Sequence, residues 1–228
     1  MRYRAILTDA DDTLLDFQSA EKNAIRELLS RFCVTDAGAA DEYRRINADC
    51  WRGYELGLIS LDGLRVVRFK RLAEAFAPSL DAQCLADAYD EILIESSRAL
   101  PGAAEAVKAI SARLPIAVVT NGMGDMQRRR LKRAGLLPYF RFVVVSEELF
   151  SRKPEPDMLL HALRLLGVDS PSDALMIGDS LTSDMPAARR AGVDFLWFNP
   201  SGHARPDGTA IAHEARTLSE LIPFATQD

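Results

Sequence analysis

The chain has 228 residues, of which 48% are hydrophobic and 27% are charged, and its formal net charge is −5. A chain of this length and composition can bury a sizeable core, so we expect a folded domain, or a domain with an insertion. The acidic balance argues against broad binding to nucleic acid polymers or to an anionic membrane surface, because both depend on a basic face. A small soluble partner is expected instead.

The expected location is the cytoplasm. No apolar stretch approaches the roughly 20 residues that span a bilayer, and MRYRAILTDADD reaches acidic residues too early for a signal peptide. The three cysteines, Cys33, Cys50 and Cys84, cannot all pair within the chain. We expect them to be buried or half-buried helical residues.

Short apolar runs predict the strands of a parallel sheet. They are rich in Val, Ile and Leu and do not alternate with polar residues, which is typical of strands buried on both faces. The predicted strands are 3–8, 115–120, 142–146, 174–178 and 194–198. The helical patterns between them cover 103–113, 125–134, 157–166 and 184–191. This alternation predicts a Rossmann-like, doubly wound α/β domain.

A long insertion interrupts the alternation. From about residue 16 to residue 98 only helical periodicity is visible, as in AEKNAIRELLSRF. Connections inside an α/β unit are usually a few residues long, so we predict a core of residues 1–15 and 99–228 and a separate all-α module of residues 16–98. The module is expected above the carboxyl ends of the strands, where ligands of open α/β sheets bind.

Residues able to do chemistry follow the first four predicted strands. These segments are Asp9-Ala-Asp11-Asp12-Thr13, Thr120-Asn121-Gly122, Lys153-Pro154, and Gly178-Asp179 with Asp184. In a parallel sheet these strand ends share one edge, so the side chains should converge in one crevice. Each segment alone has an ordinary interpretation as a helix cap, a turn or a loop. Their common position at strand ends favours a shared site.

The clustered carboxylates require a cation. At an effective dielectric of about 20, two like charges about 4 Å apart repel by roughly 4 kcal/mol. Oxygen ligands without histidine or cysteine suit Mg²⁺, which often shares its site with a substrate phosphate. Lys153, the Thr120 hydroxyl and the main-chain N–H groups near Asn121 and Gly122 are then expected to bind that phosphate.

A metal-bound phosphate predicts covalent catalysis. Asp9 can attack phosphorus to form an aspartyl-phosphate, which divides one difficult displacement into two easier ones. Asp11, two residues later, is placed to protonate the leaving alcohol and then to activate the hydrolytic water.

The run RRRLKR at 128–133 invites a nucleic-acid interpretation. It falls, however, within one predicted amphipathic helix of an acidic protein. We therefore expect it to be a solvated helix face.

The four motifs resemble those of the haloacid dehalogenase-like (HAD) hydrolases over nearly the whole chain. They are DADDTL at 9–14, VVTNG at 118–122, Lys153 in RKPEP, and IGDSLTSD at 177–184. The resemblance implies an α/β core with a helical cap and a Mg²⁺ site formed by Asp9, Asp11 through its main chain, Asp179 and Asp184. Asp184 would support either the ion or Lys153.

The same resemblance implies residue roles and a substrate class. Asp9 would be the nucleophile and Asp11 the acid/base, and Asp11 favours a phosphatase because a halide leaving group needs no proton. DADDTLLDF, with Asp12 where Gly is commoner, and NADCWRGYELGLIS at 47–60 resemble the pyrimidine 5′-nucleotidases. This implies nucleoside monophosphates as substrates.

Four residues of the inserted module are candidates for substrate specificity: Phe17, Asn47, Trp51 and Tyr54. The aromatic side chains would stack on the base and Asn47 would form hydrogen bonds with it. For Trp51 and Tyr54, packing inside the module is the alternative.

Other functions stay open. They are a phosphatase of another small metabolite, such as a sugar phosphate or phosphoglycolate, a 2-haloacid dehalogenase, and a phospho-accepting signalling module. The helical insertion and the carboxylates Asp179 and Asp184 argue against the signalling module, and Asp11 argues against the dehalogenase. The sequence leaves open whether the protein is a monomer or a homodimer.

Overall fold

The computed structural model describes residues 2–209 and 211–226. The chain divides into two compact units, Met1–Asp16 with Arg98–Asp228 and Phe17–Ser97. At the boundary of the first unit the two chain segments run side by side, because Leu15 bridges Ala99 and the Asp16 N–H donates to the Arg98 carbonyl at 3.0 Å. None of the described helices is long and apolar enough to cross a membrane.

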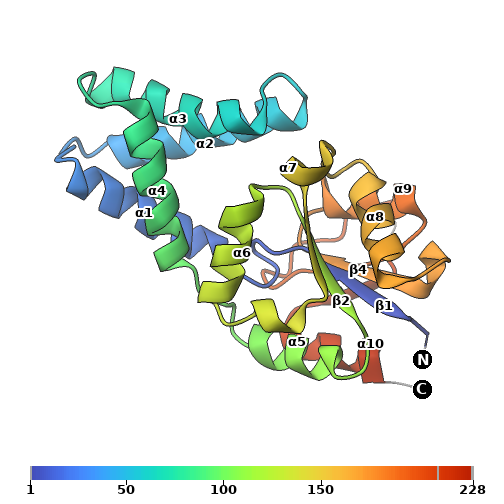
Figure 1. Ribbon diagram of the computed structural model, residues 1–228. Helices are drawn as coiled ribbons and strands as arrows, with labels where there is room; N and C mark the ends of the chain where they lie inside the picture. Colours follow the sequence, from blue (N-terminus) through green and yellow to red (C-terminus); the bar gives the residue numbers. More distant parts are fainter. Residues whose placement is uncertain (1, 210, 227–228) are drawn as a thin grey trace. The chain divides into compact units, whose positions relative to one another are not determined.

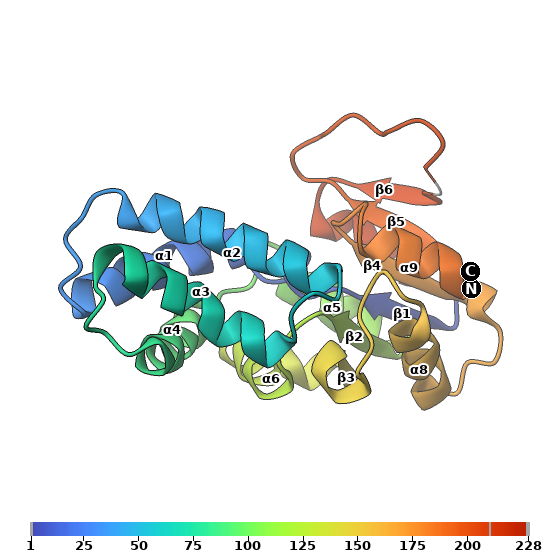
Figure 2. The ribbon, with the colours of Figure 1, turned by 90° about the horizontal axis from the view of Figure 1, so that it is seen from above.

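The first unit is built on a six-stranded parallel sheet in the order β3-β2-β1-β4-β5-β6 (Figures 1 and 2). Its strands are β1 (Ala5–Thr8), β2 (Ile116–Thr120), β3 (Phe142–Val145), β4 (Ala174–Gly178), β5 (Asp194–Phe198) and β6 (His213–Ala215). The predicted α/β fold is confirmed, and five strands lie where the apolar runs predict them. The sequence does not predict β6, because its three residues HEA contain no apolar run.

Both faces of the sheet are buried. Ala5 and Leu7 of β1 pack on one face with residues of α8 (Asp157–Leu166) and α9 (Asp184–Ala191). Ile6, between them, packs on the other face with residues of α5 (Ala103–Ser111) and α6 (Gly124–Arg133). Successive side chains of a strand point to opposite faces, so two apolar faces require a continuous apolar run. Two short helices, α7 (Ser146–Leu149) and α10 (Ile222–Thr226), complete this unit.

The second unit contains four helices: α1 (Phe17–Arg31), α2 (Ala39–Glu55), α3 (Leu61–Phe76) and α4 (Ala82–Ser96). Side-chain caps begin two of them, because Ser60 Oγ accepts from Gly63 N at 3.0 Å and Asp81 Oδ1 accepts from Cys84 N at 2.8 Å. The rings of Tyr43, Phe69 and Tyr89 pack in its interior with centroids 5.1–5.6 Å apart.

The expectation for the cysteines is correct only for Cys50, which is buried. Cys33 and Cys84 are exposed. Cys33 follows the end of α1 with a φ of 56°, where the chain turns away from the helix. Cys84 lies on the outer face of α4, one residue before the buried Leu85. The general tendency of free cysteine to be buried is thus outweighed by local position, in the turn after α1 for Cys33 and on the outer face of α4 for Cys84.

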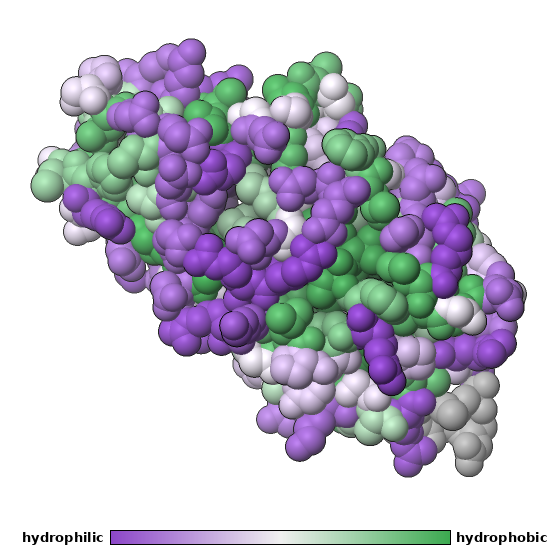
Figure 3. Space-filling view, viewed as in Figure 1, coloured by the Kyte–Doolittle hydropathy of each residue, from purple (hydrophilic) through white to green (hydrophobic). Residues whose placement is uncertain are grey.

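The edge of the sheet formed by β3 borders a groove of about 580 Å³. Its floor is formed by β3, and its walls include Leu149 and Leu165. Figure 3 shows apolar surface on the first unit. Of the residues that line the groove, Phe142 and Leu165 are 37% and 41% exposed. None of the predicted site residues lines this groove.

Candidate active site

The predicted site residues of the first unit gather at the carboxyl ends of the strands. Asp9 directly follows β1, Thr120 ends β2, and Asp179 directly follows β4. Asp184 begins α9, and Lys153 lies in the loop between α7 and α8. Thr8, the last residue of β1, is in register with Val118 and Ile177, so β2 and β4 end only two and one residues farther along the sheet.

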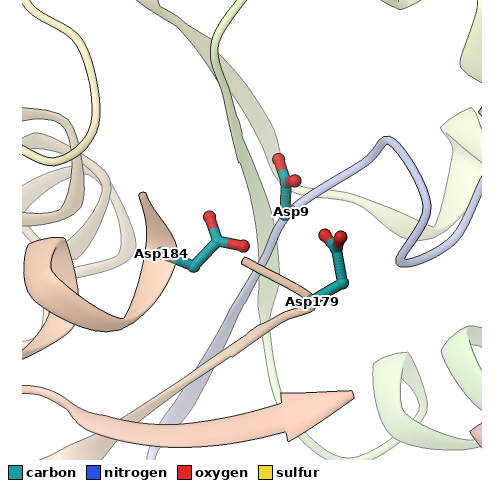
Figure 4. A group of neighbouring side chains, drawn as sticks. All are labelled: Asp9, Asp179 and Asp184. Atoms are coloured by element: carbon teal, nitrogen blue, oxygen red, sulfur yellow. The ribbon is translucent and has the colours of Figure 1, made fainter. Parts of the chain in front are cut away.

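Three carboxylates converge there. Asp9, Asp179 and Asp184 each offer an oxygen within 4.8 Å of the others, and Figure 4 shows the three side chains grouped in one place. Lys153 Nζ donates to Asp9 Oδ1 at 2.6 Å and to Asp184 Oδ1 at 2.7 Å. Lys153 is 2% exposed and Asp184 is 0% exposed, so water screens these charges little. Lys153 brings one positive charge to three carboxylates.

This charge balance shifts the pKa values of the cluster. Burial raises the pKa of Asp9 well above its ordinary value; Lys153 opposes this, and the two other carboxylates reinforce it. Burial, with the charges of Asp184 and Asp12, raises the pKa of Asp179 to about 7. Burial alone would lower the pKa of the Lys153 ammonium, but Asp184 and Asp9 together raise it. The cluster thus holds more negative charge than Lys153 neutralises.

The donor set of this cluster fits a hard divalent cation. Its ligand atoms are carboxylate oxygens, which suit Mg²⁺ rather than a thiolate-seeking or imidazole-seeking metal. A cation would also relieve the repulsion that, after burial, raises the pKa values of Asp9 and Asp179.

Close backbone approach holds Asp184 in place. Its Oδ2 accepts a hydrogen bond from Ser180 N at 3.1 Å. A Cβ added to Gly178 would lie 2.2 Å from that same oxygen and 2.7 Å from the Asp184 Cβ. Glycine at the end of β4 is therefore required by the position of Asp184.

The segment after β2 is tied to the lysine loop. Asn121 Nδ2 donates to the Lys153 carbonyl at 3.0 Å, and Lys153 N donates to Asn121 Oδ1 at 2.9 Å. The Asn121 side chain thereby fixes the backbone from which Lys153 extends. The Gly122 N–H, expected as a phosphate donor, donates to Ser146 Oγ at 3.0 Å. The Thr120 hydroxyl lies buried at the end of the strand, with 1% exposure of the residue.

The Asp11 carboxylate is held against α6. Its Oδ1 lies 2.7 Å from Arg130 Nη2, and its Oδ2 accepts from Arg130 Nη1 and from Gln127 Nε2, each at 3.0 Å. Arg130 and Gln127 are each 1% exposed. Two residues of α6 thus reach the predicted acid/base, and neither is predicted from the sequence.

The prediction that 128–133 is a solvated helix face is wrong at Arg130. The helical period puts Arg130 on the buried side of α6 together with Gln127 and Leu131, whereas Lys132 and Arg133 are exposed. A buried guanidinium is tolerated because the Asp11 carboxylate pairs with it. The helical period is the sequence signal for this burial, since Arg130 and Leu131 lie three and four residues after Gln127.

Two further residues contact Asp179. Thr13 Oγ1 donates to Asp179 Oδ1 at 3.2 Å, and Trp197 Nε1 donates to the Asp179 carbonyl at 2.9 Å. Thr13 belongs to the same short motif as Asp9, so the sequence predicts that it lies near the site. Trp197 comes from β5, and no local signal marks it.

Asn47 is engaged within the second unit. It is 6% exposed; its Nδ2 donates to Glu21 Oε1 at 2.6 Å and its Oδ1 accepts from Arg68 Nη1 at 3.0 Å. Both ends of its amide therefore have partners inside this unit.

The aromatic candidates of the second unit differ in exposure. Tyr54 is buried, while Phe17 and Trp51 are half-buried. The rings of Trp51 and Tyr54 meet edge to face, with centroids 5.8 Å apart and planes at 83°. Packing accounts for the buried ring of Tyr54, and it leaves part of Trp51 accessible.

Known proteins match this chain over nearly its full length. The haloacid dehalogenase-like hydrolase model matches residues 3–192. The pyrimidine 5′-nucleotidase PynA of Streptococcus pneumoniae is 37% identical, over 97% of this chain and 94% of the relative. The pyrimidine 5′-nucleotidase YjjG of Escherichia coli is 32% identical, over 97% of each chain. The crystal structure of the HAD-hydrolase YfnB from Bacillus subtilis, bound to magnesium, is 31% identical with a TM-score of 0.87, and the match covers 99% of this chain and 100% of that one. In agreement with the order of its four motifs and with the geometry of the strand ends, the chain belongs to the haloacid dehalogenase-like hydrolase family.

Proposed function

We propose that the protein is a Mg²⁺-dependent phosphomonoesterase that acts through an aspartyl-phosphate on Asp9. The observation that carries the proposal is the cluster of Asp9, Asp179 and Asp184 around Lys153 at the strand ends. Relatives named as phosphatases support it. They include the two pyrimidine 5′-nucleotidases and a ribulose-1,5-bisphosphate 5-phosphatase of Halopiger xanaduensis that is 30% identical over 93% of this chain.

Asp9 is the nucleophile of the proposed reaction. Lys153 binds Asp9 Oδ1, favours the ionised carboxylate and fixes its direction. The other oxygen, Oδ2, then attacks phosphorus, the bond from phosphorus to the ester oxygen breaks, and the leaving alcoholate takes a proton. The product of this step is an acyl phosphate on Asp9, which water hydrolyses to regenerate the carboxylate.

The charge of the transferred phosphoryl group must be balanced. Asp9, Asp179, Asp184 and the Asp11 main chain would hold Mg²⁺, which when bound supplies positive charge to the phosphoryl oxygens. The Lys153 ammonium and the Thr120 hydroxyl donate hydrogen bonds to the same oxygens. Asn121 contributes through the Lys153 backbone that it fixes.

Asp11 moves the protons. In the first step it gives a proton to the leaving alcohol, and in the second it takes one from the attacking water. Such proton transfer contributes about 10²–10⁴-fold to rate. Its position two residues after the nucleophile lets both groups act on one phosphorus.

We propose pyrimidine nucleoside monophosphates of the cytoplasm as the substrates. The two nucleotidase relatives and the segment 47–60 support this choice. Phe17, Asn47, Trp51 and Tyr54 are proposed to determine base preference, with the half-buried rings of Phe17 and Trp51 offering the more accessible stacking surface.

The test is a screen of phosphate release with Mg²⁺ across pyrimidine and purine monophosphates, sugar phosphates, phosphoglycolate and ribulose 1,5-bisphosphate. We expect the highest kcat/KM on a pyrimidine monophosphate and loss of activity on chelation with EDTA. Phosphate release confined to other esters would contradict the nucleotidase proposal and leave the phosphatase proposal standing.

The nucleophile is tested by Asp9→Asn, for which we expect at least about a thousand-fold loss of kcat. The matched control is Asp125→Asn, which removes an exposed carboxylate of α6 and should retain full activity. Near-normal turnover by Asp9→Asn, or halide release from a 2-haloacid by the unmodified enzyme, would overturn the mechanism.

A further inference from the structure

We propose that Gln127 and Arg130 of α6 form a positioning pair that orients the Asp11 carboxylate and directs the Thr120 hydroxyl proton toward the substrate phosphate. This inference rests on the roles that the proposed function gives to Asp11 and Thr120. Its basis is a continuous set of hydrogen bonds among four side chains of the first unit.

The direction of these bonds is set by Arg130. A guanidinium can only donate, and Arg130 Nη1 lies 2.8 Å from Gln127 Oε1, so the oxygen of the Gln127 amide faces Arg130. The amide nitrogen must then face the other way. There Gln127 Nε2 lies 3.0 Å from Asp11 Oδ2 and 3.0 Å from Thr120 Oγ1. One amide group therefore donates to the acid/base and to the phosphate-binding hydroxyl.

This arrangement decides where the Thr120 proton points. Because Thr120 Oγ1 accepts from Gln127, its own proton is directed to another acceptor. The phosphate of a bound substrate is that acceptor in the proposed function. Without Gln127 the hydroxyl could rotate and accept from water, and the phosphate would lose a donor of fixed direction.

Arg130 fixes the plane of the Asp11 carboxylate. Its two terminal nitrogens contact both oxygens, at 2.7 Å and 3.0 Å, which is the two-point geometry that a lysine cannot reproduce. Oδ2 accepts two hydrogen bonds, whereas Oδ1 meets Arg130 Nη2 only as an ion-pair contact, so Oδ1 retains the greater capacity to carry a proton. Arg130 and Gln127 are 1% exposed, so the packing around them leaves this geometry few alternatives.

Two substrates with different leaving groups can show whether Gln127 and Arg130 position Asp11 or only support the fold. An alkyl phosphate such as uridine 5′-monophosphate needs a proton on its leaving oxygen, whereas p-nitrophenolate leaves without one. Loss of Asp11 orientation should therefore slow the first step for the alkyl ester more than for p-nitrophenyl phosphate. The ratio of the two kcat/KM values reports that step alone, because kcat/KM ends at the first irreversible event.

The experiment measures this ratio in Gln127→Met and Arg130→Lys at saturating Mg²⁺, with melting curves to establish that each variant is folded. We expect the alkyl-to-aryl ratio to fall by about 10–100-fold in Gln127→Met and by less in Arg130→Lys, which keeps the charge. The inhibition constant of inorganic phosphate should rise in Gln127→Met, because the Thr120 donor is no longer directed. Lys132→Met, an exposed neighbour on the same helix, should leave the ratio and the constant unchanged.

Asp11→Asn separates the acid/base role of Asp11 from the positioning role of Gln127 and Arg130. It should lower the ratio by itself, and Gln127→Met added to it should lower the ratio no further. An unchanged ratio in Asp11→Asn would overturn the acid/base role in the proposed function, and the positioning pair with it. A lowered ratio in Asp11→Asn, together with an unchanged ratio or an equal loss on both esters in Gln127→Met and Arg130→Lys, would overturn the positioning pair alone.

Discussion

Lys153 of the first unit and Arg68 of the second are both buried almost completely, and their surroundings are opposite. Lys153 in the first unit is 2% exposed and Arg68 in the second is 3% exposed. Lys153 donates to two carboxylates at 2.6 and 2.7 Å, and a third carboxylate lies beside them. Arg68 donates to the neutral amide of Asn47 at 3.0 Å, and its closest approach to Asp90 is 3.9 Å.

The surroundings of Arg68 are those of a packing residue. Its guanidinium carbon lies 5.0 Å from the centroid of the Phe69 ring and 4.8 Å from that of Tyr89. Aromatic faces and one amide oxygen stabilise a cation without a surplus of negative charge. Around Lys153 the surplus exists: burial and, after it, the neighbouring carboxylates raise the pKa of Asp9 and of Asp179. The charge imbalance around Lys153 coincides with the candidate site, whereas the surroundings of Arg68 are those of a core residue.

Replacing each cation with methionine should separate these roles. Lys153→Met should lower kcat/KM for p-nitrophenyl phosphate by about 10²–10³-fold, because a donor to the transferred phosphoryl group is lost. Arg68→Met should keep this kcat/KM within about twofold and lower the free energy of unfolding by about 2–3 kcal/mol, since the ring contacts and a hydrogen bond are lost. Steady-state kinetics and urea unfolding measure the two effects. Equal kinetic losses in both variants would remove the distinction.

The surplus charge also predicts how stability depends on pH. The pKa of Asp179 is raised to about 7 in the folded chain, from about 3.9 in an unfolded one. Between these values the folded chain holds a proton that the unfolded chain has released, so the free energy of unfolding decreases as pH rises through this window. Burial raises the pKa of Asp9 in the same direction.

Urea unfolding in EDTA at pH 5 and pH 8 checks this dependence. The unmodified protein should be more stable at pH 5, and the difference should shrink in Asp179→Asn. Saturating Mg²⁺ should raise stability mainly at pH 8, where the carboxylates are ionised. If the metal-free protein instead became more stable from pH 5 to pH 8, the negative charge of the carboxylates would be neutralised within the folded chain, and the contrast with Arg68 would disappear.

The sequence predicts what depends on a local pattern. A buried apolar run followed at once by Asp9 or Asp179 is enough to predict a strand and a functional residue at its carboxyl end. The burial of Arg130 depends on Asp11, which lies 119 residues away in the chain, so a run of basic residues favours a solvated face until that partner is known. The helical period alone places Arg130 on the buried side of α6, whereas its charge favours an exposed position.

The smallest expected effect concerns the rim of the charged cluster, at Asp12. This half-buried residue has a φ of 54°, in the left-handed region that favours glycine, and its charge helps to raise the pKa of Asp179. In Asp12→Gly the relief of backbone strain, about 1–2 kcal/mol, is offset by the greater flexibility of glycine in the unfolded chain, about 0.5–1 kcal/mol. The free energy of unfolding should therefore change by no more than about 1.5 kcal/mol, and kcat should stay within about twofold because Asp12 takes no part in the proposed chemistry. The dependence of the free energy of unfolding on pH in EDTA should become slightly shallower, because one contributor to the raised pKa of Asp179 is gone.

Two outcomes would contradict this expectation. A loss of kcat as large as that of Lys153→Met would extend the catalytic cluster to Asp12, whereas an unchanged pH dependence would confine the surplus charge to Asp9, Asp179 and Asp184.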